Sequence, residues 1–273
     1  EVKVNPEEGD YNLEILEDVA EESLGDGWRV DEENARYYDA QGREITDPEQ
    51  QPGAARVVYR ASNGDESQEL AVDMQQVEVP LEGSEETRAV TVYSSSPGGR
   101  PGHTVVYGPS LEGSYQYGNA VVLAPGNELP RDSLGRVDPH AIHMALLGRD
   151  PDDDEPRTAL GVTFTAGGEE VHAVSAHLTN RKQGHEDRDQ SIREQYARHE
   201  FFTRQWYGDN NTITGGDFNS VPGEDGFPEV DLEGVSVDGK DVVLVNRQDR
   251  IENAETRGRG GSDHALIVTD VVV

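Results

Sequence analysis

Two short motifs near the C-terminus combine acidic, amide and imidazole side chains: Gly-Asp-Phe-Asn at residues 216–219 and Ser-Asp-His at residues 262–264. The first follows a short apolar stretch, residues 212–214, and the second precedes another, residues 265–268. Each motif therefore places an acid and a polar partner at the end of an expected β-strand, where a rigid scaffold can orient them. Such a set can hold a hard divalent cation and transfer a proton during hydrolysis of a phosphate ester.

Two further segments carry polar side chains on expected strands. They read Tyr-Gly-Asn-Ala-Val-Val-Leu at residues 117–123 and Val-His-Ala-Val-Ser-Ala-His-Leu at residues 171–178. With these four motifs in this order, the sequence over residues 100–273 resembles the endonuclease/exonuclease/phosphatase superfamily, the family of DNase I. The resemblance implies an α/β (α+β) fold, a four-layer sandwich of two mixed β-sheets flanked by helices. We expect one catalytic domain over residues 1–273, with a divergent, acidic portion at residues 1–70.

The resemblance also implies roles for the motif residues. Asp217 would orient or activate the attacking water, and Asn219 would position the phosphate. Asp263 would bind metal or orient a histidine, and His264 would act as general base or phosphate ligand. His177 would be the general acid that protonates the leaving oxygen. The alternatives without a catalytic role are a capped turn at residues 217–220, a surface turn at residues 263–264 and a structural histidine at the end of a strand.

Two more residues are candidates for substrate binding. Arg157 precedes an expected strand at residues 159–164, and its guanidinium suits a phosphate contact. Asn119 lies in the Gly-Asn-Ala segment, where it either contacts substrate or satisfies the backbone of its turn.

The metal-binding glutamate of the superfamily has no clear counterpart. The segment Asp-Met-Gln-Gln-Val-Glu at residues 73–78 places Gln76 at that position, with Glu78 two residues further on the same strand face. An amide oxygen is a weaker ligand than a carboxylate for Mg²⁺, the expected cation, or for Mn²⁺ or Ca²⁺ in its place. Either other carboxylates complete the metal site, or the chain has lost its metal and its activity. The five motif residues that are present favour an active enzyme.

Several elements must position these groups. Apolar stretches predict strands at residues 56–60, 70–79, 103–107, 119–123, 159–164, 171–175, 212–214, 242–245 and 265–273. Ile192, Tyr196, His199 and Trp206 recur at helical spacing and predict a helix between the His-Leu and Gly-Asp-Phe-Asn motifs. The Ser, Gly and Pro content of residues 94–102 favours a flexible loop.

The chain is strongly acidic, with 55 acidic and 23 basic residues and a formal net charge of −32. Only three of the basic residues are lysines, which is typical of proteins from salt-loving microbes. Self-repulsion at this charge needs screening, and about 1 M salt shortens the Debye length to roughly 3 Å. Residues 1–50 hold 17 acidic and four basic residues, whereas residues 177–204 hold six basic against five acidic. This asymmetry favours a phosphorylated substrate near the motifs, or ion pairs along a helix face.

Three functions remain open. Metal-dependent hydrolysis of DNA or RNA at high salt comes first, although the net charge opposes general electrostatic attraction to nucleic acid. The second is another phosphodiester or phosphomonoester, such as a phospholipid or inositol phosphate, and the third is non-catalytic binding on the same fold. No apolar run of 18 residues predicts a membrane span. We expect a monomer, and a first residue other than Met slightly favours an exported protein over a cytoplasmic one.

Overall fold

The computed structural model describes residues 2–4, 24, 27–47, 50, 54–64, 66–110, 116–149, 156–179, 186–207, 211–219, 233–237, 241–245, 251–257 and 266–271. Asp263 and His264 lie outside the described residues. Within the described part, no helix has the length and apolar character needed to span a membrane.

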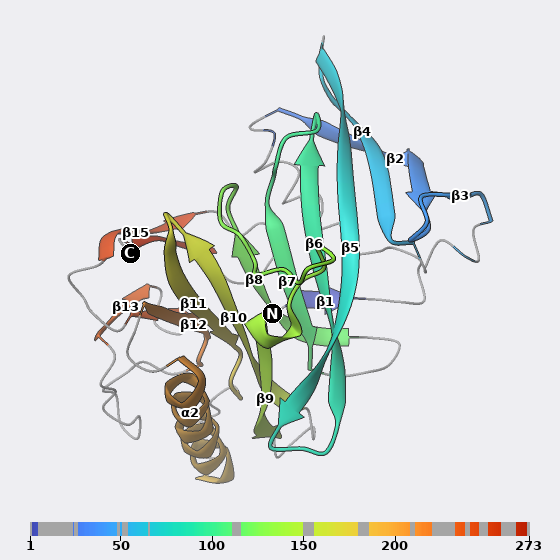
Figure 1. The fold of residues 1–273 in the computed structure, drawn as a ribbon. Helices are drawn as coiled ribbons and strands as arrows, with labels where there is room; N and C mark the ends of the chain where they lie inside the picture. The colour runs from blue at the N-terminus through green and yellow to red at the C-terminus, as the bar shows by residue number, and fades with distance from the viewer. Residues whose placement is uncertain are drawn as a thin grey trace.

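Strands dominate the described chain (Figure 1). They are β1 (Val2–Val4), β2 (Arg29–Tyr38), β3 (Glu44–Ile45), β4 (Arg56–Asn63), β5 (Glu66–Glu82), β6 (Thr87–Pro97), β7 (Thr104–Pro109), β8 (Gln116–Leu123), β9 (Ile142–Arg149), β10 (Pro156–Ala166), β11 (Glu169–Ala176), β12 (Thr212–Asp217), β13 (Glu233–Val237), β14 (Asp241–Val245), β15 (Ile251–Arg257) and β16 (Leu266–Val271). The helical elements with described bounds are the 3-10 turn η3 (Pro139–Ala141) and the α-helix α2 (Glu186–Tyr207).

The long strand β5 joins two groups of strands into one continuous hydrogen-bonded sheet. Its length is the reason, because most of β5 pairs with β4 and β6 while its last residues, Leu81 and Glu82, pair in parallel with β9. The first half-sheet contains β1, β8, β7, β6, β5, β4, β2 and β3, and the second half-sheet contains β9, β10, β11, β12, β14 and β13. The pairing of β11 with β12 is also parallel.

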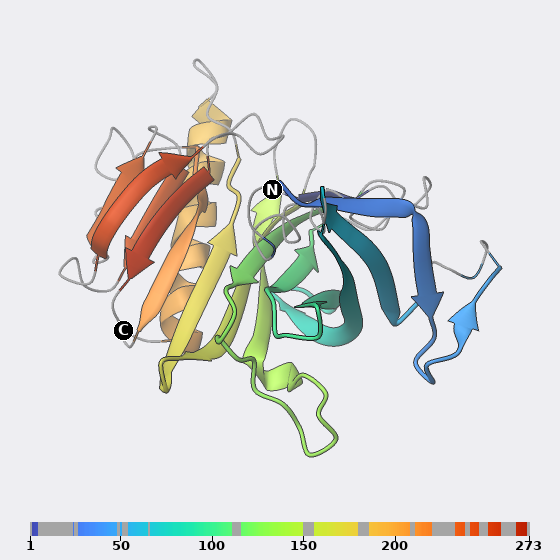
Figure 2. The ribbon, with the colours of Figure 1, turned by 90° about the horizontal axis from the view of Figure 1, so that it is seen from above.

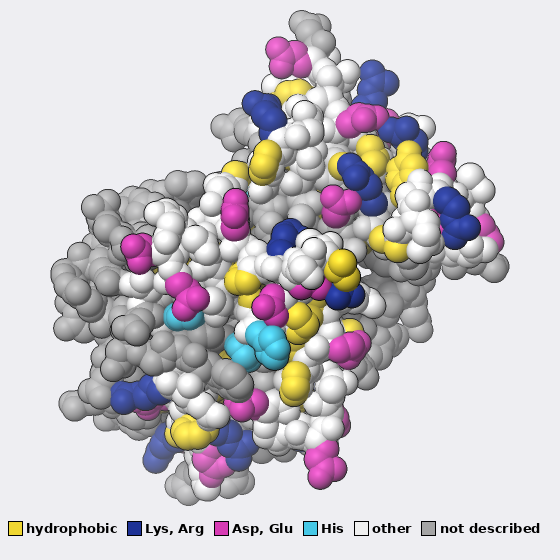
Figure 3. Space-filling view, in the orientation of Figure 1, with side chains coloured by type: hydrophobic (Ala, Val, Ile, Leu, Met, Phe, Trp, Pro, Cys, Tyr) yellow, Lys and Arg dark blue, Asp and Glu magenta, His cyan; other side chains and the backbone are white. Residues whose placement is uncertain are grey.

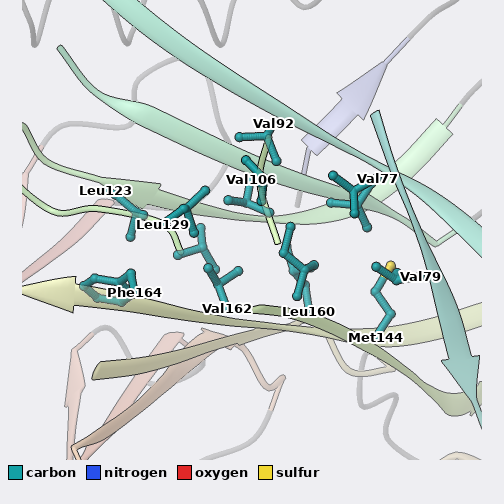
Figure 4. Close-up of a cluster of buried hydrophobic side chains, with 14 of the residues drawn as sticks. Val77, Val79, Val92, Val106, Leu123, Leu129, Met144, Leu160, Val162 and Phe164 are labelled. Atoms are coloured by element: carbon teal, nitrogen blue, oxygen red, sulfur yellow. The ribbon is translucent and has the colours of Figure 1, made fainter. Parts of the chain in front are cut away.

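The main core lies between the inner faces of the two half-sheets (Figure 4). Val77, Val92 and Val106 of the first half-sheet face Leu160 and Val162 of the second. Full burial of one such side chain contributes roughly 1.5–3 kcal/mol. The expected sandwich of packed, mixed sheets in an α/β chain is therefore confirmed.

Different elements cover the two outer faces. Tyr196 and Phe202 of α2 pack on the second half-sheet (Figure 2), which confirms the predicted helix. The first half-sheet curls, so that Tyr59 of β4 packs in one cluster with Tyr93 of β6 and Tyr107 of β7. In the described residues, strands therefore cover much of the outer face of the first half-sheet, where we expected helices.

The sequence-based elements differ from the structure in several places, and the described strands that lie outside every expected strand region are β1, β2, β3, β6, β9, β13 and β15. All nine expected strand regions contain strands, although most run longer than predicted. The expected loop at residues 94–102 is wrong in its first part, because β6 extends through Pro97. Ser95 is buried there, and its Oγ donates to the carbonyl of His103 at 3.0 Å, which satisfies a polar side chain inside a strand.

Gly216 allows β12 to approach β11 closely. Its φ of 139° is one that side-chain-bearing residues rarely adopt, and a Cβ at this position would lie 2.0 Å from the carbonyl oxygen of Ala176. That oxygen belongs to backbone at the end of a paired strand, so it cannot move without disturbing the sheet.

We predict that Gly216→Ala lowers the free energy of unfolding by about 3 kcal/mol or more, because of this clash. Gly126→Ala is the matched control, since Gly126 has a φ of 93° but open space around a Cβ. It should cost only about 1 kcal/mol of backbone strain. Urea unfolding of both variants measures the difference, and equal losses would show that the close approach is unimportant.

Candidate active site

One edge of the second half-sheet gathers the polar ends of three strands. Arg157 is the second residue of β10, His177 follows the last residue of β11, and Asp217 is the last residue of β12. Because β11 and β12 are parallel, their carboxyl ends meet at the same edge. The antiparallel β10 begins there, with Ala159 opposite Ala176.

Backbone hydrogen bonding continues past the ends of these strands. Leu178 N–H donates to the carbonyl oxygen of Asp217 at 2.9 Å, and Asn219 Nδ2 donates to the carbonyl oxygen of Leu178 at 2.8 Å. Asn219 has a φ of 51°, a left-handed conformation that asparagine tolerates better than most residues. The His-Leu motif and the Gly-Asp-Phe-Asn motif are therefore joined by direct hydrogen bonds.

His177 is surrounded by the other described candidates. Its Nε2 lies 3.2 Å from Asn219 Nδ2 and 3.6 Å from Asp217 Oδ2, while its Nδ1 lies 3.5 Å from an Arg157 guanidinium nitrogen. Asp217 Oδ1 also accepts the backbone N–H of Asn219 at 2.8 Å. The side chains of His177 and Asp217 are 17% and 11% exposed, so the cluster is partly open to solvent.

A bulge in β9 lies opposite the start of β10, the strand that carries Arg157. The pairing of β10 with β9 shifts register between Arg157 and Thr158, so that Leu147 of β9 is an extra residue. Bulges of this kind bend a strand and change the direction of its side chains. Arg198 of α2 donates to the carbonyl oxygen of Leu147 at 3.1 Å, which stabilises the irregular backbone.

Asn119 contacts this site from the first half-sheet. Its buried Nδ2 donates to the carbonyl oxygen and hydroxyl of Thr158 at 3.0 and 3.1 Å, and Ser110 Oγ hydrogen-bonds the same hydroxyl. Asn119 thus contacts Thr158, the residue that follows Arg157. Neither Thr158 nor Ser110 was identified from the sequence, since single hydroxyl residues at strand ends give no distinctive pattern.

Gln76 and Glu78 lie apart from the cluster. Both are exposed on the face of β5 opposite the buried Val77 and Val79. Gln76 is three strands from β8 through the pairs of β5 with β6, β6 with β7 and β7 with β8, a separation of about 14 Å. The structure therefore does not bring either residue to the described site.

The described residues do not form a metal centre. No group of three or more His, Cys, Asp or Glu side chains among them is arranged to hold a metal ion. Asp217 lies 3.6 Å from His177 Nε2 and supplies a carboxylate to the cluster. The fourth motif, with the metal candidate Asp263 and the catalytic candidate His264, belongs to the part of the chain that is not described.

A buried group behind the site supports the Gly-Asp-Phe-Asn motif. Phe218 is fully buried, and its ring lies edge-on to His199 of α2 at a centroid distance of 5.1 Å. His199 Nε2 hydrogen-bonds Thr214 Oγ1 at 2.9 Å, and burial lowers the pKa of His199 to about 4. His199 thus packs inside the protein behind the motif, and His172 of β11 is also buried and hydrogen-bonds Thr163.

Comparisons with known proteins give matches only at the level of structure. No sequence-family model and no curated protein matches the chain. Among solved structures, a mannosyl-6-phosphatase from Bacteroides thetaiotaomicron is 11% identical, over 73% of this chain and 77% of that one, with a TM-score of 0.39. The human Nocturnin catalytic domain with bound sulfate is 13% identical, over 61% and 72%, with a TM-score of 0.40.

A structure from Bacteroides vulgatus described as an endonuclease/exonuclease/phosphatase is 13% identical, over 74% of this chain and 76% of that one, with a TM-score of 0.40. That description names the family that the four sequence motifs resemble. At such low identities and TM-scores, these similarities decide neither the reaction nor the substrate of this chain, which have to be argued from its own side chains.

We predict that His199 makes the protein less stable in acid. Its pKa is about 4 in the folded state and about 6.5 in the unfolded state, so the unfolded state binds more protons between these values. The stability that neutral His199 provides is complete above pH 6.5 and falls as the pH drops toward 4, by about 3 kcal/mol in total.

His199→Gln keeps a side-chain hydrogen bond to Thr214 possible but removes the titrating group. The measurement is the free energy of unfolding of both proteins between pH 4 and 7, in steps of about half a unit. The wild type should show the steeper pH dependence. Parallel curves would contradict the assigned burial of a neutral imidazole.

Proposed function

We propose that this chain hydrolyses phosphoric esters, and that its substrate is a phosphodiester, with DNA or RNA as the leading candidate. The observation that supports this most strongly is the surroundings of His177. A guanidinium from the start of β10, and a carboxylate and a carboxamide from the end of β12, all lie within 3.6 Å of its ring nitrogens. Such a set can bind an anion and move a proton at one place.

Arg157 and Asn219 are the proposed groups for phosphate recognition. Arg157 has five N–H donors in a planar fork that matches the oxygens of a phosphate. Asn219 is held by Leu178, which fixes the direction of its amide. Charge is spread over the three equatorial oxygens in the transition state of phosphoryl transfer, so donors held in fixed directions toward those oxygens would accelerate the reaction.

His177 and Asp217 are the proposed groups for proton transfer. A water oxygen attacks phosphorus, the bond from phosphorus to the leaving oxygen breaks, and that oxygen takes up a proton. Asp217 orients the water and accepts its proton. His177 donates a proton to the leaving oxygen, and its Nε2 lies 3.6 Å from Asp217 Oδ2.

A requirement for a divalent cation is supported by the sequence resemblance alone. We include Mg²⁺, but assign no step to it, since the described residues contain no cluster suited to a metal ion. Of the candidate metal ligands, Asp263 remains, and His264 stays the candidate general base or phosphate ligand. Gln76 and Glu78 are no longer favoured as ligands, because both face away from the cluster.

The surface charge fits a substrate bound by local contacts. On the face in Figure 3, acidic and basic side chains are interspersed over the described residues, without one continuous basic area. A net charge of −32 weakens long-range attraction to a polyanion. Recognition would therefore rest on Arg157 and hydrogen bonds, which salt screens less than diffuse charge.

The second candidate is non-catalytic binding of a phosphorylated ligand. The observation that favours it is the position of Gln76 and Glu78, which leaves the described site with Asp217 as its carboxylate. Arg157, His177 and Asn219 would still suit an anion, so this alternative predicts phosphate binding without turnover.

The test is cleavage of supercoiled plasmid, a substrate on which single nicks are visible, in about 1–3 M salt. We expect nicking with Mg²⁺ and none with EDTA. His177→Ala and Asp217→Ala should each lower the rate by about 100-fold or more, since each removes a proton-transfer group. His264→Ala should do the same if the fourth motif joins the site.

His140→Ala is the control, because His140 is an exposed histidine outside the cluster. It should leave the rate unchanged. A folded wild type that cleaves no nucleic acid but hydrolyses p-nitrophenyl phosphates would move the assignment to small phosphoesters. Phosphate binding without any hydrolysis would replace the proposal by the non-catalytic one.

A further inference from the structure

Gln195, within α2, is a buried side-chain amide with both of its groups engaged. It is 1% exposed, and its Oε1 accepts the backbone N–H of Thr179 at 2.9 Å. Its Nε2 donates to the hydroxyl of Thr179 at 2.8 Å. Thr179 is fully buried and lies two residues after His177, in backbone that has left β11. The helix thus holds the segment that carries His177.

The same amide reaches the strand that pairs with Arg157. Gln195 Nε2 lies 3.4 Å from the carbonyl oxygen of Arg149, at the end of β9. A Cβ on Gly148 would lie 3.4 Å from Gln195 Cγ, so the side chain packs directly on this backbone. Gly148 pairs with Arg157 across the bulge. One side chain therefore bridges the segments that carry His177 and Arg157.

We propose that Gln195 is a positioning residue that sets the placement of His177 relative to Arg157 and thereby the rate of phosphoester hydrolysis. The inference rests on the proposed function. An amide suits this position because it offers an acceptor to an N–H and a donor to a hydroxyl or carbonyl at the same time. Gln195 itself contacts none of the four clustered side chains through the hydrogen bonds described, so it would act through Thr179 and β9.

Other residues hold His177 from the opposite side. Leu178 is bound to Asp217 and Asn219, which fixes the backbone after His177 toward β12. Without Gln195, that attachment would remain, and His177 would stay near Asp217 while its distance from Arg157 became less defined. A displacement of about 1 Å can lower a rate about 100-fold.

The decisive variant is Gln195→Met, which keeps the length of the side chain and removes its hydrogen bonds. Gln205→Met is the matched control, because Gln205 is exposed on the same helix. We expect Gln195→Met to lower kcat by about 10–100-fold with KM changed less than about threefold. Gln205→Met should match the wild type in both constants.

A second variant tests the same contact in case Gln195→Met does not fold. Thr179→Val removes only the hydroxyl that accepts from Gln195 and should lower kcat in the same sense. The double variant Thr179→Val/Gln195→Met should be little slower than Gln195→Met alone, because both changes break the same contact.

A spectroscopic measurement separates this inference from the proposed function. The imidazole Cε1–H signal of His177, assigned by its loss in His177→Gln, should shift or broaden in Gln195→Met and not in Gln205→Met. An inactive wild type would refute the function while this signal still tests the positioning. A folded Gln195→Met protein with unchanged kcat and an unmoved His177 signal would overturn the inference.

Discussion

The hydrogen bond from Leu178 N–H to the carbonyl oxygen of Asp217 is the contact on which the site depends. It extends the parallel pairing of β11 and β12 beyond the two strands and places the residues on either side of it, His177 and Asn219, in one cluster. The contact requires the two backbones to approach closely at Gly216, where a Cβ would collide with Ala176. A single local constraint thus converts two separate sequence motifs into one arrangement of side chains.

The rest of the fold makes that arrangement rigid. The apolar core between the half-sheets fixes the sheet, and a bulge in β9 lies opposite the start of β10. The helix α2 supports this edge, because Gln195 contacts Thr179, Arg198 contacts Leu147 of β9 and His199 contacts Thr214 of β12. Polar groups behind the site are hydrogen-bonded to one another, as in the pair of His199 with Thr214. Such supported groups keep their directions when charge develops in front of them.

The sequence predicted the strand ends and the cluster of His177, Asp217, Asn219 and Arg157, because period-two apolar stretches and short motifs are local signals. It missed the whole of β6, and over Ser94 to Pro97 buried hydrogen bonds outweigh a composition typical of loops. Gln76 and Glu78 were predicted as metal ligands from their spacing along the chain. Spacing cannot specify how β5 turns between two half-sheets, which places these side chains on the outer face. Thr158 and Gln195 matter only through contacts between distant segments.

We propose that His177, which follows β11, and Asp217, the last residue of β12, act as one unit. The most direct measurement is a double-variant cycle on the hydrolysis rate, with His177→Gln, Asp217→Asn and the pair together. If Asp217 and His177 act together in one step, as base toward the water and acid toward the leaving oxygen, the double variant should be about as slow as the slower single variant. Losses that multiply, each variant adding its full effect to the other, would contradict the account and show two independent roles.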